Sequence, residues 1–142
     1  MKIYIMRHGK PDTPQFPNKV NSKAFRNCLE IYNRCGILDD SRPTNATIEL
    51  FREISAIVSS DLKRSIDSAS LLCSQNTLIV DPLFREIEDS FISIPFLKLK
   101  PSTWGTIFIL LWFCGAFKMK SAFRDGEKRA QICAGKLADL AN

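Results

Sequence analysis

The chain has a single histidine, His8, which stands between Arg7 and Gly9 at the end of a short apolar run. A neutral imidazole is nucleophilic near neutral pH without a separate base, so it can attack phosphorus. The planar guanidinium group of an arginine forms paired hydrogen bonds with phosphate oxygens. The Arg7–His8 pair therefore has the residue types that phosphoryl chemistry needs, and Gly9 lets the backbone approach a ligand closely.

A second arginine, Arg64, falls in the first turns of a helix that is expected to follow a short strand. The start of a helix offers free backbone N–H groups and the positive end of the helix dipole. Two guanidinium groups beside such a helix start form a pocket for a tetrahedral oxyanion. We expect Arg7 and Arg64 to hold phosphate oxygens while His8 attacks the phosphorus.

The elements that position these residues alternate between strands and helices. Apolar β-branched runs predict strands at residues 2–6, around Ile57 and Val58, and at 77–80. The first strand is expected to be buried on both faces. Helices are predicted at residues 22–35, at 45–54, after a Ser59 or Ser60 N-cap, and near the C-terminus, where one stripe carries Phe123, Ala130, Cys133, Leu137 and Leu140.

This alternation predicts an α/β fold with a mostly parallel sheet. Ligands of such sheets bind outside the carboxyl ends of the strands. Both Arg7–His8 and Ser59–Ser60 fall at such ends.

Length and charge limit the classes of function. The 142 residues fit one domain, and the formal net charge of +5 is too small and too dispersed to indicate a nucleic-acid binder. The densest basic stretch, residues 118–129, also contains Asp125 and Glu127, which is typical of a solvated helix face. Phosphorylated small molecules or phosphoproteins are the expected partners, and nucleic acid is not.

The cysteines indicate the compartment. There are five, at positions 28, 35, 73, 114 and 133, with no C-x-x-C pair, and one histidine completes no zinc set. Buried thiols in a reducing cytosol are expected, so the predicted location is cytoplasmic and no metal is expected. The N-terminal apolar run breaks at Arg7, too early for a signal peptide.

Residues 101–117 form an uncharged stretch of 17 residues, just under the roughly 20 that span a bilayer. A buried or half-exposed helix is the favoured interpretation. Contact with a membrane surface through Trp104 and Trp112 is the weaker alternative.

Three short motifs, in order, are similar to those of one protein family. The segment IMRHGK resembles the Arg-His-Gly signature of the histidine phosphatase superfamily, the phosphoglycerate mutase-like proteins. SSDLKRSIDSA resembles that family's second motif, and PLFREIED resembles its third, a Leu-x-Glu segment. The resemblance implies a three-layer α/β/α fold of the phosphoglycerate mutase-like type, with one domain over residues 1–142.

The resemblance also assigns roles. It implies that His8 forms a phosphohistidine, that Arg7 and Arg64 bind phosphate, and that Glu86 protonates the leaving oxygen with no cofactor. Glu88 and Asp89 are rivals for the acid, and a salt bridge of Glu86 to Arg85 or a lysine is the structural alternative. Residues 93–118 resemble an apolar insertion that caps the active site in one subgroup, so the natural substrate is left open.

Two departures qualify the resemblance. Lys10 stands where the family often has Glu or Gln, and the second catalytic histidine on a later, central strand has no counterpart. The chain thus looks like the first two-thirds of a histidine phosphatase, with a C-terminal portion missing. Truncation is the favoured explanation. The alternatives are a phosphate or phosphopeptide binder that lost turnover and a central strand donated by another chain. The oligomeric state is left open.

Overall fold

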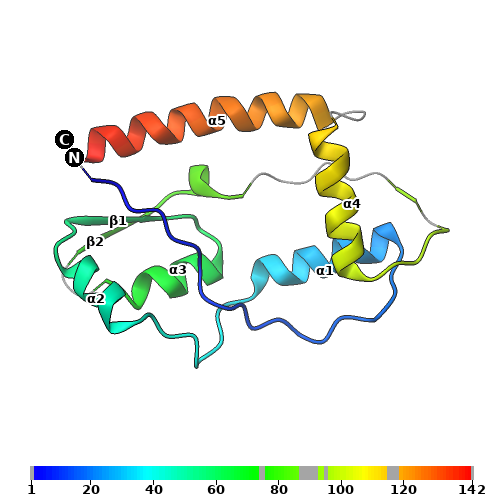
Figure 1. Cartoon of the computed structure of the whole chain (residues 1–142), viewed down its shortest axis with the longest axis horizontal. Helices are drawn as coiled ribbons and strands as arrows, with labels where there is room; N and C mark the ends of the chain where they lie inside the picture. Colours follow the sequence, from blue (N-terminus) through cyan, green and yellow to red (C-terminus); the bar gives the residue numbers. More distant parts are fainter. Residues whose placement is uncertain (1, 74–75, 87–92, 95, 115–118, 142) are drawn as a thin grey trace. The chain divides into compact units, whose positions relative to one another are not determined.

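The structure is a computed structural model that describes residues 2–73, 76–86, 93–94, 96–114 and 119–141. Its described residues form a mixed α/β fold with five α-helices and a small parallel sheet of two strands (Figure 1). In chain order the elements are α1 (Ser22–Arg34), α2 (Asn45–Arg52), β1 (Ala56–Ser59), α3 (Lys63–Ser70), β2 (Thr77–Val80), the 3-10 helix η1 (Pro82–Phe84), α4 (Pro101–Phe113) and α5 (Met119–Leu140).

The chain divides into two compact units. The first unit comprises Met1–Thr13, Asn33–Arg85 and Cys133–Asn142, and the second comprises Pro14–Tyr32 and Glu86–Ile132. Each unit has its own buried apolar cluster.

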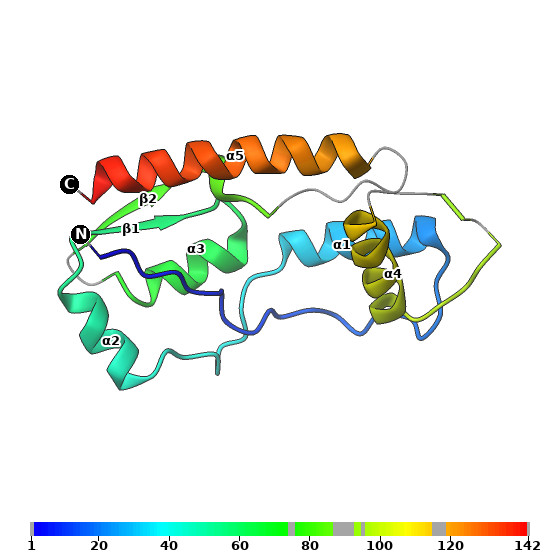
Figure 2. The ribbon, with the colours of Figure 1, turned by 45° about the horizontal axis from the view of Figure 1, so that its top comes forward.

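The first unit is built on the parallel pair of β1 and β2, in which Ala56 aligns with Thr77 and Ser59 with Val80. Its buried cluster consists of Phe51 from α2, Ile57 from β1 and Ala69 from α3. In both views α3 and the C-terminal turns of α5 lie on opposite sides of this sheet (Figures 1 and 2). The predictions of a parallel pair and of strands at 77–80 and around Ile57 are confirmed.

The predicted strand at residues 2–6 is wrong, because this segment has no strand structure. It is also far from buried, since Ile5 is 90% exposed and Met6 50% exposed. A strand needs a partner for its backbone N–H and C=O groups, and the ladder of β1 runs to β2, not to this segment. The β-branched composition is therefore present without the pairing that would make a strand.

The start of α3 also differs from the prediction. The N-cap is Leu62 and not Ser59 or Ser60, and no side chain caps the helix. Both serines are buried at the end of β1, where Ser59 Oγ donates a hydrogen bond to the Ser60 carbonyl. The Ser59 hydroxyl group thus stabilises the turn after the strand. Arg64 nevertheless falls in the first turn of α3, as predicted.

The second unit packs α4 against α1. Trp104 and Phe108 of α4 are buried with Val20, Phe25 and Cys28. The Trp104 indole N–H donates to the Val20 carbonyl at 2.7 Å, and Val20 also exchanges two backbone hydrogen bonds with Leu99. Burial raises the pKa of the Cys28 thiol.

The expectation of a half-exposed apolar helix at residues 101–117 is confirmed for α4. Trp104 has no exposed surface, whereas Phe113 is 74% exposed. In the part of the chain that the structure describes, no helix combines the length and the apolar character needed to cross a membrane.

Candidate functional site

The imidazole of His8 is fixed through both of its nitrogens. Nδ1 lies 2.7 Å from the carbonyl oxygen of Gly9, and Nε2 lies 3.2 Å from Nε of Arg64. A carbonyl oxygen can only accept, so Nδ1 carries a proton, and a guanidinium N–H can only donate, so Nε2 carries a lone pair. The two contacts together define a neutral imidazole whose Nε2 is unprotonated. This is the form that can act as a nucleophile.

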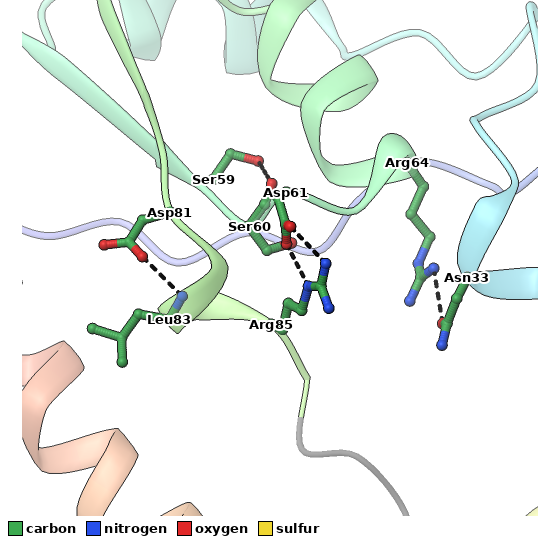
Figure 3. Close-up of polar contacts among 8 residues, drawn as sticks. All are labelled: Asn33, Ser59, Ser60, Asp61, Arg64, Asp81, Leu83 and Arg85. Carbon is green, nitrogen blue, oxygen red and sulfur yellow. Dashed lines mark hydrogen bonds and ion pairs between the residues drawn. The ribbon is translucent and has the colours of Figure 1, made fainter. Parts of the chain in front are cut away.

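Arg64 comes from the first turn of α3 and has no exposed surface. Its Nη1 donates to Oδ1 of Asn33 at 3.3 Å, as Figure 3 shows. Burying a guanidinium is costly unless polar partners surround it, and the His8 ring and the Asn33 amide are two such partners. The structure therefore places a full positive charge directly beside Nε2.

The backbone after His8 is held by two serine hydroxyl groups. The Gly9 N–H donates to Oγ of Ser68 on α3 at 2.9 Å, and the Lys10 N–H donates to Oγ of Ser41 at 2.8 Å. A Cβ on Gly9 would lie 2.6 Å from Ser41 Oγ, so a side chain here would displace the hydroxyl group that accepts from the Lys10 N–H. Ser68 Oγ in turn donates to the Arg64 carbonyl at 2.7 Å, which ties the His8 segment to the helix that carries Arg64.

The carboxyl ends of both strands carry charged pairs. Arg85, after η1, pairs with Asp61, after β1 (Figure 3). This hydrogen bond from Arg85 holds the pKa of Asp61 below its usual range. Asp81 pairs with Lys136 of α5 and caps the Leu83 N–H, and these contacts lower its pKa. Both carboxylates thus hold the chain that follows their strand in place.

A groove in the first unit opens beside His8. It has a volume of about 750 Å³ and is lined by residues 2–8, by residues 53–60, and by side chains of α2, α3, η1 and the C-terminal end of α5. We call it the β1 groove. Arg7, which is exposed, lines it together with His8. Its apolar lining includes Leu72, Phe84 and Leu137.

Of the predicted site residues, the structure brings His8 and Arg64 into contact. Arg7 stays on the wall of the groove, and among the described residues no hydrogen bond or ion pair joins it to His8 or Arg64. Glu86 is exposed and belongs to the second unit. Its rivals Glu88 and Asp89 lie outside the described residues.

Three residues of the site were not predicted from the sequence: Asn33, Ser41 and Ser68. Ser68 could have been found, because it follows Arg64 by four positions and so lies on the same face of α3. Asn33 and Ser41 come from loops or helix ends distant in sequence from His8. No local pattern marks such residues.

No metal site accompanies these contacts within the described ranges, since no group of three or more His, Cys, Asp or Glu side chains could hold an ion there. Comparison with family models, with curated proteins and with solved structures finds no match to this chain.

Proposed function

We propose that this protein is a phosphomonoesterase that acts through a phosphohistidine at His8. The observation that carries the proposal is the pair of contacts on the imidazole, from the Gly9 carbonyl to Nδ1 and from Arg64 to Nε2. They give an unprotonated nitrogen with a cation at hydrogen-bond distance. The proposal includes the three-layer α/β/α fold, with a larger sheet, that the histidine phosphatase resemblance implies. It also includes a cytoplasmic location and a reaction without a metal or organic cofactor.

In the first step, Nε2 of His8 attacks phosphorus and the P–O bond to the leaving group breaks. The Arg64 Nε–H, which donates to His8 Nε2 before the reaction, then donates to a phosphate oxygen. Arg7 donates to a second phosphate oxygen from the groove wall. The phosphorylated ring is cationic, and the Gly9 carbonyl oxygen next to Nδ1–H stabilises that charge. The histidine phosphatase resemblance assigns the proton for the leaving oxygen to Glu86.

In the second step, water attacks the phosphohistidine and the P–N bond breaks. The same resemblance assigns the proton of this water to the carboxylate that the first step left behind. Inorganic phosphate leaves and His8 returns to its neutral form. The positive charge of the arginines is present throughout, so the protein need not reorganise as negative charge develops.

A second candidate is a phosphate or phosphopeptide binder without turnover. The observation that favours it is that the sequence supplies one imidazole, His8, and no second one to flank the phosphoryl group. Both candidates require the same His8–Arg64 contact, and they differ in whether a phosphorylated intermediate forms.

The test is hydrolysis of p-nitrophenyl phosphate by the parent, by His8→Ala and by Ser70→Ala. Ser70 is an exposed residue of the same helix as Arg64, so its variant is the matched control. We expect turnover in the parent and in Ser70→Ala, and none above background in His8→Ala. Because His8 is the only histidine, any phosphohistidine detected after a rapid acid-free quench lies at this residue. Equal rates for His8→Ala and the parent would reject the enzyme.

Phosphate binding without turnover would select the second candidate. Isothermal titration calorimetry with inorganic phosphate measures it, and His8→Ala should then lose the binding signal.

A further inference from the structure

The strand β1 has an open edge on the β1 groove. The Thr77 N–H donates to the Ser55 carbonyl, and the Asp81 N–H donates to the Ser59 carbonyl. With the parallel register of β1 and β2, these bonds show that residues 55, 57 and 59 turn their backbone groups toward β2. Ala56 and Val58 must therefore turn their N–H and C=O groups the other way.

That other side is the groove. In Figure 2 the N-terminal segment runs along β1 on the side away from β2, and residues 2–8 and 53–60 line the groove together. Among the described residues, no backbone hydrogen bond satisfies Ala56 or Val58 on this side. Ordered donors and acceptors at strand spacing are the surface to which an extended peptide adds.

The side chains around this edge suit the same occupant. Across the groove, Ile3, Tyr4 and Ile5 are 43%, 45% and 90% exposed, and Leu72 and Leu137 contribute further apolar lining. One strand of a peptide presents alternating side chains to two sides, so apolar side chains of a docked strand would cover such walls. A compact sugar phosphate would leave both the apolar walls and the backbone groups uncovered.

The charged residues of the groove also fit a phosphorylated peptide. The groove contains His8 and Arg7 together with the backbone edge, so a ligand anchored on β1 can carry its negative group to these residues. A phosphate monoester is the group that the guanidinium fork and the neutral imidazole fit best. A free strand without phosphate would not use this end of the groove.

From these observations we infer that the substrate is a phosphorylated polypeptide bound in extended conformation, with its main chain paired to Ala56 and Val58 and its phosphate at His8. This inference rests on the proposed function for the phosphate, but the pairing with β1 is independent of turnover. The balanced reaction is that of the proposed function: the P–O bond of the phosphorylated side chain breaks, and its hydroxyl group is released with a proton.

The experiment uses the nonapeptide Val-Thr-Val-Thr-phosphoSer-Thr-Val-Thr-Val with blocked ends, and N-acetyl phosphoserine methylamide as the control that lacks a strand. Binding is measured by fluorescence anisotropy of the labelled nonapeptide, displaced by each unlabelled compound. We expect the nonapeptide to bind at least about tenfold more tightly than the control, since several main-chain hydrogen bonds are gained. Equal affinities would overturn the inference.

N-methylation of the peptide makes the test specific for β pairing. Methyl groups on alternate residues block every second donor, and we expect the set that faces β1 to weaken binding by about tenfold or more and the other set by less than about threefold. Equal effects of the two sets would overturn pairing with β1.

The hydrolysis assay and the nonapeptide binding assay together distinguish a failure of this inference from a failure of the proposed function. If p-nitrophenyl phosphate is hydrolysed with His8 dependence but the nonapeptide has no advantage, the enzyme stands and the peptide substrate fails. If the nonapeptide binds with the alternating N-methyl pattern but nothing is hydrolysed, the docking edge stands and the enzyme fails. If the nonapeptide neither binds nor reacts, the peptide inference is rejected.

Discussion

At the scale of single residues, the ring of His8 is oriented by groups that belong to its own backbone and to α3. The Gly9 carbonyl fixes the proton on Nδ1, and Arg64 faces Nε2. Ser68 links the two, because its hydroxyl accepts from the Gly9 N–H and donates to the Arg64 carbonyl. Ser68 is therefore a positioning residue, which acts through the backbone that presents His8.

Replacing Ser68 by alanine should reveal this role. Ser68→Ala leaves the Gly9 N–H without its acceptor, so the free energy of unfolding should fall by about 1–2 kcal/mol. With His8 less well placed, kcat for p-nitrophenyl phosphate should fall about tenfold while KM changes little. Urea denaturation and steady-state kinetics measure the two effects.

The conservative change and a neighbouring serine give the controls. Ser68→Thr keeps the hydroxyl group and should recover most of kcat. Ser70→Ala removes an exposed hydroxyl group from the same helix and should resemble the parent. If Ser68→Ala also resembles the parent in kcat, the bridge from Gly9 to Arg64 does not position the imidazole.

At the scale of elements, the ends of the two strands are fixed by ion pairs to elements that follow them. Asp81 joins the end of β2 to Lys136 of α5 and caps η1 through the Leu83 N–H. The hydrogen bond from Lys136, and then that from Leu83, hold the pKa of Asp81 below its usual range. The pair therefore stabilises the folded state only while Asp81 is ionised.

The direction of the pH effect follows from this lowered pKa. The unfolded carboxyl has a pKa of about 3.9, so the stabilisation is fully present above that pH. It is lost as the pH falls through the lower pKa of the folded state. Asp81→Asn should flatten the acid side of the stability curve, as followed by urea denaturation between about pH 2 and pH 6.

Asp39 offers a matched control, because it is exposed and the structure gives its carboxylate no ion pair among the described residues. Asp39→Asn should leave the acid side of the curve close to that of the parent. A parent and an Asp81→Asn variant that lose stability over the same acid range would contradict the role assigned to the Lys136 pair.

The same elements show which parts of the fold a sequence pattern predicts correctly. The strand at 77–80 and the helix that carries Arg64 were predictable, because short β-branched runs and 3.6-residue periodicity are local signals. Residues 2–6 carry the same β-branched signal, yet they form no strand, because a strand depends on a partner that a local pattern does not report. The predicted N-cap of α3 was wrong for a related reason, because the Ser59 hydroxyl donates to the Ser60 carbonyl and does not cap the helix.

Some residues of the candidate site were likewise predictable from the sequence, and others were not. The proximity of His8 and Arg64 was predicted, although one of the two strands on which that prediction rested, at residues 2–6, does not form. The role of Asn33 and Ser41 was not predicted, because their positions depend on how distant loops fold back on residues 8–10. Glu86 was assigned by resemblance alone, and it lies in the second unit.

At the scale of the whole molecule, stability is divided between two separate buried clusters. The second unit depends most on Trp104, which is the largest apolar side chain with no exposed surface among the described residues. It stacks on Phe108 with ring centroids 5.6 Å apart and donates its indole N–H to Val20. The apolar helix α4 is thereby anchored through the face that carries Trp104 and Phe108.

Truncation of that side chain should therefore be costly, whereas truncation of an exposed one in the same helix should not. Trp104→Ala removes a fully buried aromatic ring and should lower the free energy of unfolding by about 3–5 kcal/mol. Leu110→Ala removes a side chain that is 58% exposed and should change it by less than about 0.5 kcal/mol. Urea denaturation followed by circular dichroism compares the two, and similar costs for both would contradict the anchoring of α4 through Trp104.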